Sequence, residues 1–501
     1  MNSSHIIIID FESQYTKLIA KLVRKENVYC EVYHYTQLHK ISKKITGIIC
    51  SGSYHSVLSE NSPKIDWKKY NNIPILTICY STQLFAHYKG ANIIKSQNRE
   101  FGKTEGIIIR DHPLWNNIEN LDTVWMSHND SIKFEKNNIN ILAKTKTNKV
   151  VAFEDNNVIS LLFHPEVSHT RHGNRIVYNF LKICKCSFDW TPKNICIESI
   201  KNIKNKIGTD KVIMAVSGGV DSTVAATLIH KSIGKQLQCV LVNNGLMRKN
   251  EIKNVKEIYE KIGLNIVIIE ASFFFIKNLK NITEPEKKRK IIGHTFIDTF
   301  TNYVDGKNIQ WLGQGTIYPD VIESNYGKHT IKSHHNVGGL PENLSFKLIE
   351  PLRNLFKDEV RELGKELQIP DCILSRHPFP GPGLGIRIIG SITLDKIKML
   401  QKADQIYISL LHKHNLYNKI WQAGAILLPI KTVGVMGDCR TYDATIALRA
   451  VTSIDGMTAD VYPIPYDVLI EISTSIVNSV SGINRVVYDI TTKPPSTIEW
   501  E

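Results

Sequence analysis

The sequence of 501 residues contains no apolar run that approaches the ~20 residues a membrane-spanning helix needs. Its first segment, MNSSHIIIIDF, has no basic residue ahead of a short apolar run and no cleavage site. We therefore interpret Ile6–Ile9 as a buried strand and not as part of a signal peptide. Both absences predict a cytoplasmic protein without a membrane partner.

The cysteines show no paired framework. There are nine of them, an odd number, scattered along the chain. The spacing of Cys184-Lys185-Cys186 is too short for ordinary zinc ligands. The pattern excludes a disulfide scaffold and fits the reduced thiols of a cytoplasmic protein.

The basic charge lacks the arrangement that nucleic-acid binding usually requires. Net charge is +14, from 62 basic and 48 acidic residues, but no arginine-rich tail or basic stripe with interleaved aromatics is present. RNA or DNA binding is one interpretation. We favour another, in which the composition is rich in lysine, isoleucine and asparagine and the ligands are anionic nucleotides. No nucleic-acid partner is predicted.

The most informative stretch is KVIMAVSGGVDSTVAATLIH, from Lys211 to His230. It reads as a buried strand at Val212–Val216, a glycine turn, and a helix. A helix N-terminus after a glycine turn offers unpaired amides and a partial positive charge, which together favour phosphate. The pattern differs from GxxxxGK[ST], and the shorter cradle suits a pyrophosphate. The predicted phosphate-binding residues are Ser217, Gly218, Gly219, Val220, Asp221, Ser222 and Thr223.

The first 190 residues alternate strand-like runs with helical patterns, which predicts an α/β domain with a mostly parallel sheet. Active groups of such sheets lie at the carboxyl ends of strands. Cys79 ends one strand where a helix begins, a position that favours the thiolate. His164 and Glu166 end another strand and can form a base with its orienting partner.

Further along the chain, three local predictions depend on pattern alone. Phe188–Pro192 is predicted to be a linker, with Pro192 ending regular structure. Glu350–Gly364 is predicted to form a helix supported by charge pairs four residues apart. A strand is predicted at Ser453–Thr458.

The phosphate loop resembles that of the N-type ATP pyrophosphatases, which cleave ATP between the α and β phosphates. Cys79, His164 and Glu166, in this order, resemble the triad of class I glutamine amidotransferases. The segments DFESQY, REFG and VWMSHND match the same family. The resemblance implies that the Cys79 thiolate attacks the glutamine amide and that His164 protonates the departing ammonia. It places four residues near the substrate glutamine, namely Gln83, Ser127, His128 and Asp130.

The last third carries HPFPGPGL, LLPIKTVGVMGDCRTYD, DGMTADV and NRVVYDITTKPPSTIEWE. These segments resemble the C-terminal dimerisation domain of the glutamine-hydrolysing GMP synthetase family, and the resemblance covers essentially the whole chain; Gly424 is a visible departure. It implies an amidotransferase domain at 1–190 with a flavodoxin-like, mostly parallel sheet. It further implies a parallel-sheet ATP pyrophosphatase domain at 191–380 and a smaller α+β domain at 381–501, through which the chain forms a homodimer.

The family reaction converts ATP, XMP, glutamine and water to GMP, AMP, pyrophosphate and glutamate through adenylyl-XMP. ATP is thus expected as co-substrate and Mg²⁺ as cofactor. Asp320 and Glu323 lie beside the phosphate loop in the sequence pattern and either hold Mg²⁺ or cap a helix. The resemblance implies that XMP is contacted by Arg289, Gln422, Arg485, Lys493, Ile498 and Glu499.

The amidotransferase region departs from its family pattern. Thr77 and Ser81 replace the glycines of the nucleophile turn, where the family has Gly-x-Cys-x-Gly. Gly52-Ser53-Tyr54 replaces Gly-Gly-Pro in the oxyanion loop, and Glu12 replaces another glycine. In the pyrophosphatase region Asn243 replaces a usual aspartate. These departures predict weak or unusually gated glutamine hydrolysis, and the alternative is an ammonia-dependent synthetase.

Two functions of a different class are also compatible with parts of the sequence. An RNA-modifying ATP pyrophosphatase would explain the basic charge, but it calls for a zinc or thiolating cysteine pair that the sequence does not show. A non-catalytic glutamine sensor would not need the intact SGGVDST and C-terminal segments. The sequence favours the synthetase.

Overall fold

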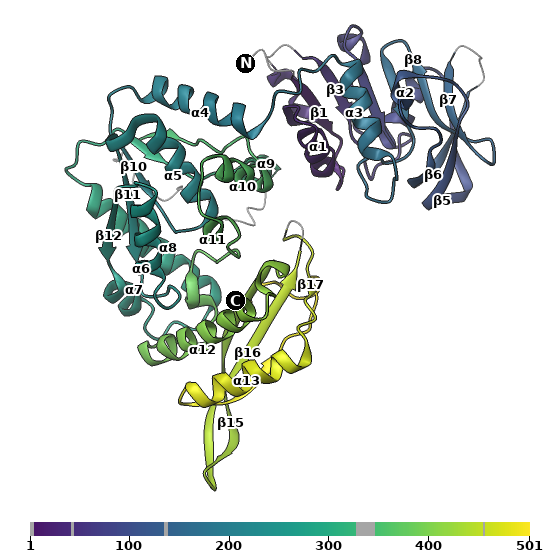
Figure 1. Cartoon of the computed structure of the whole chain (residues 1–501). Coiled ribbons are helices and arrows are strands. Elements are labelled where there is room, and N and C mark those ends of the chain that lie inside the picture. Colours follow the sequence, from purple (N-terminus) through teal and green to yellow (C-terminus); the bar gives the residue numbers. More distant parts are fainter. Residues whose placement is uncertain (1–4, 42–44, 135–138, 327–345, 454–455) are drawn as a thin grey trace. The chain divides into compact units, whose positions relative to one another are not determined.

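The computed structural model describes residues 5–41, 45–134, 139–326, 346–453 and 456–501. The chain divides into two compact units, Met1–Ile195 and Cys196–Glu501, and each is described by itself. Figure 1 shows the helices and strands of both. Within the described residues, every helix is too short or too polar to cross a membrane.

The first unit is built on a nine-stranded sheet. Five neighbouring strands are parallel and place their carboxyl ends at one edge. The remaining four pair antiparallel and extend the sheet on one side. In order across the sheet the strands are β2 (Cys30–His34), β1 (Ile6–Asp10), β3 (Gly47–Cys50), β4 (Ile75–Ile78), β9 (Val158–Leu161), β8 (Val150–Asp155), β7 (Asn140–Thr145), β5 (Asn92–Ile108) and β6 (Asp122–Lys133).

The parallel part is held by short, continuously apolar strands. All five residues of β1 are buried, as are all four of β3, β4 and β9. Strands buried on both faces require helices on both sides. Three helices belong to this unit: α1 (Thr16–Lys25), α2 (Tyr80–Tyr88) and α3 (Gly173–Ile183), of which α1 and α3 pack against each other (Figure 1).

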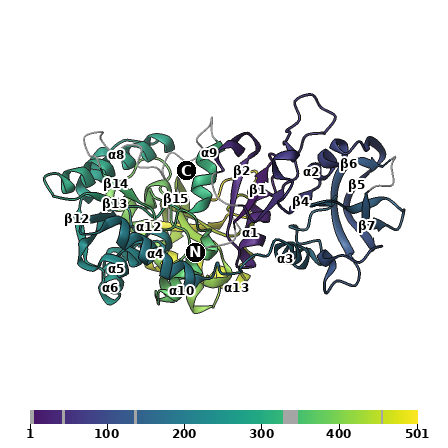
Figure 2. The same cartoon turned by 90° about the horizontal axis from the view of Figure 1, so that it is seen from above.

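The second unit contains a five-stranded, fully parallel sheet. Figure 2 shows α8 and α5 on opposite sides of this sheet. The strands in order are β12 (Ile266–Glu270), β11 (Leu237–Asn243), β10 (Val212–Ala215), β13 (Trp311–Gly313) and β14 (Lys347–Ile349). Its helices are α5 (Val220–Ile233), α6 (Glu251–Lys261), α7 (Ser272–Asn278), α8 (Pro285–Val304), α9 (Tyr318–Tyr326), α10 (Lys357–Glu366) and α11 (Asp371–Leu374).

A mostly antiparallel sheet forms the rest of this unit. Strands β15 (Gln422–Met436) and β16 (Cys439–Thr452) form a long hairpin that extends beyond the helices in Figure 1. β16 also pairs with β17 (Asp460–Val461) and, in parallel, with β18 (Ile483–Tyr488). Helices α12 (Leu394–Lys413) and α13 (Tyr466–Ser479) pack on it.

One continuous hydrophobic core joins the two sheets of the second unit. It runs from Val240 in β11 through Leu246 and Leu384 to Leu448 in β16, and all four are almost fully buried. The segment between the sheets is therefore fixed to both. The predicted α/β class with a smaller α+β part is confirmed.

Three local predictions were wrong. Pro192 starts helix α4 (Pro192–Ile207), because a proline is well tolerated in the first turn of a helix. Residues 350–356 precede α10, whose start is capped by the Glu359 carboxylate on the Phe356 amide at 2.7 Å. The described residues of Ser453–Thr458 form a turn, because the Ser453 hydroxyl bonds both the Gly456 amide and the Thr458 carbonyl.

Candidate active sites

Cys79 occupies a sharp turn between β4 and α2. Its backbone has φ +55° and ψ −108°, a conformation that a non-glycine residue adopts only under constraint. The side chain is buried and its Sγ lies 3.6 Å from the Ser127 carbonyl oxygen. Such a strained strand-to-helix turn is the geometry that presents a nucleophile at the edge of a sheet.

The residues that replace the elbow glycines form hydrogen bonds. The Ser81 hydroxyl accepts from the Ile78 amide and donates to the Cys50 carbonyl, each at 2.9 Å. The Thr77 hydroxyl donates to Ser160 Oγ, also at 2.9 Å. Neither Thr77 nor Ser81 has a positive φ. The turn thus accommodates both side chains, and their hydroxyls join it to the neighbouring strands β9 and β3.

His164 and Glu166 follow β9 at the same edge. His164 Nδ1 lies 2.7 Å from Glu166 Oε1, and both side chains are buried. Burial alone would lower the pKa of His164, but the neighbouring Cys79 and the hydrogen bond to Glu166 outweigh it and raise the pKa well above its usual value. The imidazole is therefore protonated near neutral pH and is placed to give a proton to a leaving group beside Cys79.

Gly52 lies directly against this pair. A Cβ at this position would sit 3.2 Å from His164 Cε1, a tight approach, and 3.6 Å from Cys79 Cβ, an ordinary contact, so a larger residue would crowd the His164 ring. Ser53, which replaces a glycine in this loop, has no positive φ, so its backbone is free of the strain that a positive φ would impose. Glu12, which also replaces a glycine, does have a positive φ, at +68°.

The four residues predicted to surround glutamine gather on α2 and β6. Gln83 Nε2 donates to the Asp130 carbonyl at 3.0 Å. Ser127 contributes the carbonyl beside Cys79, and the side chains of His128 and Asp130 are buried on the same strand. The structure thus brings together Cys79, His164 and Glu166 with these residues.

The phosphate loop forms between β10 and α5. Gly218 has φ +72° and a Cβ there would lie 2.5 Å from a Val255 methyl carbon, so glycine is required on two grounds. The hydroxyl of Thr223 bonds the Gly219 carbonyl and the Tyr259 hydroxyl, each at 2.8 Å. The backbone of the turn is thereby fixed from inside the helix, with its first-turn amides directed outward from the helix end.

Charged residues absent from the predicted set surround this loop. Lys357 Nζ lies 2.7 and 2.6 Å from the two carboxylate oxygens of Asp221. Arg376 Nη1 donates to the Gly218 carbonyl at 2.8 Å. Burial lowers the pKa of Arg376 to about 10, so it stays charged near neutral pH. Their sequence signal was weak, because both lie in segments that read as a helix and a loop.

Of the two acids suggested for Mg²⁺, the structure describes the side chain of Asp320. Asp320 Oδ2 accepts from the Ile317 amide at 3.1 Å and caps the start of α9. The side chain of Glu323 lies outside the described residues. Over the part of the chain that the structure describes, no group of three or more His, Cys, Asp or Glu residues is arranged to hold a metal ion.

A cleft in the second unit contains three of the six residues predicted to bind XMP. Arg387 donates to both carboxylate oxygens of Glu499, at 2.9 and 2.8 Å, and Gln422 Nε2 donates to Glu499 at 3.0 Å. Arg387 holds the pKa of Glu499 below its usual value against the effect of burial. The cleft is lined by Arg387, Gln422, Ala423, Gly424, Ile426, Arg449, Val451, Ile498 and Glu499.

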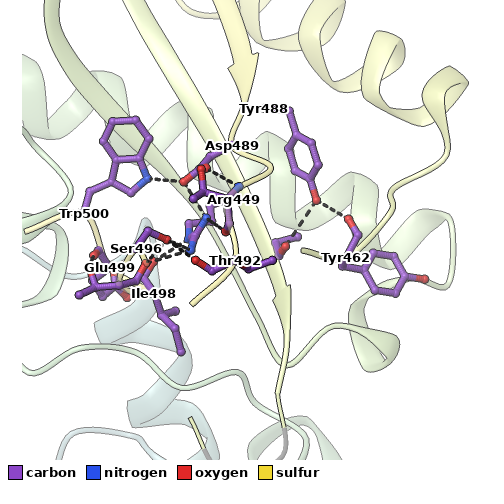
Figure 3. A network of polar contacts seen from close by, with 12 residues as sticks. Arg449, Tyr462, Tyr488, Asp489, Thr492, Ser496, Ile498, Glu499 and Trp500 are labelled. Atoms are coloured by element: carbon purple, nitrogen blue, oxygen red, sulfur yellow. Dashed lines mark hydrogen bonds and ion pairs between the residues drawn. The ribbon is translucent and has the colours of Figure 1, made fainter. Parts of the chain in front are cut away.

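Arg449 on β16 orders the segment that carries Glu499. Its guanidinium donates to the Ile498 carbonyl at 2.9 Å and to Asp489 at 2.6 Å. Figure 3 shows the network, in which Asp489 also accepts from the Trp500 indole. Further bonds from Arg449 reach the Thr491 carbonyl, the Ser496 hydroxyl and the Thr497 carbonyl.

The other three predicted XMP residues lie outside this lining. Arg485 is exposed on β18, and Lys493 Nζ donates to the Gly456 carbonyl at 2.8 Å. Arg289 on α8 donates to the backbone oxygen of Glu501. Sequence reasoning missed Arg387 and Arg449, although each is a lone arginine within an apolar run, GIRIIG and IALRAV.

Gly424 is required by the position of Arg387. A Cβ on Gly424 would lie 2.2 Å from Nη1 and 2.6 Å from Cζ of Arg387. We expect Gly424→Ala to displace the guanidinium, to lower the free energy of unfolding by about 1–3 kcal/mol through overpacking, and to raise the KM for XMP. Denaturant unfolding and steady-state kinetics measure the two effects.

Gly293 provides the matched control, because it lies within α8 and a Cβ there meets no atom within 4 Å. Gly293→Ala should leave the free energy of unfolding unchanged or raise it slightly, because alanine has a higher helix propensity than glycine. Wild-type stability and KM for XMP in Gly424→Ala would show that the guanidinium does not depend on this glycine.

Comparisons with known proteins agree with this geometry. Family models match as glutamine amidotransferase class-I at residues 7–184, NAD synthase at 193–290, and GMP synthase C terminal domain at 409–500. A glutamine-hydrolysing GMP synthase of Cytophaga hutchinsonii is 51% identical over 99% of both chains. One from Christiangramia forsetii is 50% identical over 99% of this chain and all of its own.

Among solved structures, a glutamine amidotransferase from Thermotoga maritima matches 41% of this chain and 86% of its own, with 16% identity and a TM-score of 0.29. The full-length relatives carry the assignment, because their similarity extends over both units and not over the amidotransferase region alone. The chain belongs to the family of glutamine-hydrolysing GMP synthases.

Proposed function

We propose that this chain makes GMP from XMP, with ATP as the activating co-substrate and glutamine as the nitrogen donor. The observation that carries the proposal is the buried Cys79–His164–Glu166 arrangement in a full-length member of this family. The hydrogen-bonded elbow around Thr77 and Ser81 favours the glutamine route over the ammonia-only alternative.

In the first unit, the Cys79 thiolate attacks the side-chain carbonyl carbon of glutamine. Protonated His164, held by Glu166, gives its proton to the departing nitrogen, and ammonia leaves. Water, deprotonated by His164, then attacks the thioester, which releases glutamate and restores the thiolate. Gln83, Ser127, His128 and Asp130 are proposed to hold the substrate glutamine.

In the second unit, the xanthine O2 of XMP attacks the α-phosphorus of ATP, and the bond to the β-phosphate oxygen breaks. The leaving pyrophosphate carries negative charge that the turn Ser217–Thr223 is proposed to stabilise through the positive end of the α5 helix dipole. Ammonia then adds at C2 and AMP departs. Gln422, Ile498 and Glu499 are proposed to contact the purine, and Arg289, Arg485 and Lys493 are proposed as further XMP contacts.

Mg²⁺ is proposed to arrive on the phosphate oxygens of ATP, since the described carboxylates Asp221 and Asp320 already have partners. We also propose the domain limits 1–190, 191–380 and 381–501, a homodimer formed through the last of them, and a cytoplasmic location. The exposed apolar side chains of the β15–β16 hairpin, Ile430, Val433, Val435 and Tyr442, support a dimer surface there.

GMP formation from XMP and ATP, run in parallel with glutamine and with ammonium, tests the proposal. We expect both donors to support GMP formation, with glutamate released only in the first reaction. GMP from ammonium alone would establish the ammonia-dependent alternative. A chain that forms no GMP with either donor would refute the proposed function.

A further inference from the structure

Glu12 is the centre of a polar cluster beside the amidotransferase site. Its carboxylate accepts from the Tyr54 hydroxyl at 2.8 Å, and it lies 3.2 Å from His55 Nε2 and 3.4 Å from His34 Nε2. Burial would raise the pKa of Glu12, but these three hydrogen bonds outweigh it and lower the pKa. The carboxylate is thus ionised and holds three side chains from two different segments.

The backbone presents Glu12 to this cluster at some conformational cost. Asp10 at the end of β1 accepts from the amides of Glu12 and Ser13, at 2.9 and 3.1 Å, and fixes the turn. Within that turn Glu12 has φ +68°, where glycine is favoured. A glutamate kept at a position that suits glycine calls for a function of its side chain.

His34 is fixed on both sides of its ring. Its Nδ1 lies 2.7 Å from the Thr36 hydroxyl, and its Nε2 lies 3.4 Å from the Glu12 carboxylate. The ring of His55 packs against that of Tyr54 with centroids 4.1 Å apart, which makes these two partners of Glu12 one unit.

The cluster ends in the loop that contacts the nucleophile. Tyr54 and His55 follow Gly52, where a Cβ would lie 3.2 Å from His164 Cε1 and 3.6 Å from Cys79 Cβ. On the far side, the Ser56 hydroxyl donates to Asp130 Oδ2 at 3.1 Å. The loop is thus attached to Glu12 through Tyr54 and His55 and to Asp130 through Ser56, and Gly52 and Ser53 lie just ahead of these attachments.

We propose that Glu12 is a positioning residue for glutamine hydrolysis, which fixes the loop 52–56 against Cys79 and His164 through Tyr54 and His55. This inference rests on the proposed function. In this chain the Glu12 side chain would hold the oxyanion loop rigid, where the Gly-Gly-Pro sequence would otherwise do so. Glu12 itself does not touch the reacting atoms and acts through the loop alone.

Glu12→Gly is the most informative variant, because it removes the carboxylate and relieves the positive φ. We expect kcat for glutamine hydrolysis, measured with XMP and ATP present, to fall about 10-fold, since small displacements of positioning groups have effects of this size or larger. KM for glutamine should change less than kcat. The thermal midpoint should stay equal or rise, and GMP formation from ammonium should be unchanged.

Three further measurements separate positioning from a general structural role. Glu12→Gln keeps an acceptor for Tyr54 and should recover part of the lost rate, and Tyr54→Phe should reproduce part of the loss. The rate of Cys79 alkylation, followed by peptide mass spectrometry, should match wild type in Glu12→Gly, because the Cys79–His164 pair is not altered. Glu60→Gln, an exposed acid later in the same segment, is the control.

The inference is overturned if Glu12→Gly hydrolyses glutamine at the wild-type rate, or if it loses thermal stability and Cys79 reactivity together with activity. These outcomes differ from a failure of the proposed function. In that case the wild-type chain itself would release no glutamate, or would form no GMP from ammonium.

Discussion

Replacing Cys79 by alanine is expected to abolish glutamate release from glutamine and to leave GMP formation from ammonium intact. The rate of hydrolysis should fall on the order of 10⁴-fold or more, as when the nucleophile of an acyl-transfer triad is removed. Cys50 on the neighbouring strand β3 is a poor substitute, because it is fully buried and burial raises the pKa of its thiol. Parallel assays of glutamate release with glutamine and of GMP formation with ammonium measure the two effects separately.

Cys372→Ala serves as the matched control, because Cys372 is an exposed cysteine on α11 in the second unit and belongs to neither predicted site. It should leave both donor reactions unchanged. If the Cys79→Ala chain still released glutamate from glutamine, the nucleophile would have to be another residue. If ammonium-dependent synthesis were lost as well, the substitution would have disturbed more than the hydrolysis.

Removal of Lys493–Glu501 is expected to abolish XMP adenylation. The segment carries Glu499, which accepts two hydrogen bonds from buried Arg387. It also carries the carbonyl groups of Thr497 and Ile498, which accept hydrogen bonds from Arg449. Without this segment, Arg387 would keep Asp404, at 3.8 Å, as an acidic neighbour. The cleft would also lose two of its lining residues, Ile498 and Glu499. XMP-dependent exchange of pyrophosphate into ATP measures adenylation directly, and retained exchange in the shortened chain would contradict the expectation.

Because the shortened chain could lose activity simply by unfolding, a point substitution provides an independent test. Glu499→Gln keeps the shape of the side chain and removes its charge. We expect XMP-dependent exchange to fall at least about 10-fold, because a hydrogen bond to a charged group contributes about 1.5–3 kcal/mol. Glu499→Ala should also lower the free energy of unfolding by about 3–5 kcal/mol, since Arg387 would be a buried charge without its partner.

Trp500→Phe is the control in the same segment. It removes the indole hydrogen bond to Asp489 and keeps the ring. Because Arg449 holds Asp489 independently, exchange should stay near the wild-type rate. A loss as large as that of Glu499→Gln would mean that the order of the whole segment, and not the Arg387–Glu499 pair, determines XMP binding.

The sequence predicted best those sites that depend on a local run of residues. The strand, turn and helix around Gly218 and the elbow at Cys79 were both located, because a glycine turn or a polar residue at the end of an apolar strand is visible within a few positions. The order of the parallel strands then brings Cys79, His164 and Gly52 to one edge without further information.

What could not be predicted depends on long-range contacts. The hydrogen bonds of Thr77 and Ser81 could not be foreseen, because their partners on β3 and β9 are distant in the sequence. Arg387 and Arg449 were missed for the same reason, since their function is defined by Glu499 and the residues around it. Glu12 was noted only as a departure, because its partners His34 and Tyr54 lie 22 and 42 positions away.

The Arg387–Glu499 pair also has a consequence for synthesis of the chain on the ribosome. The two residues are 112 positions apart, so the arginine leaves the exit tunnel long before its carboxylate is made. Until then the guanidinium lacks its bidentate carboxylate partner and has Asp404 at 3.8 Å, so burying it would be costly. We therefore expect this core to stay open to chaperones during translation, and to close only when the residues around Glu499 have emerged.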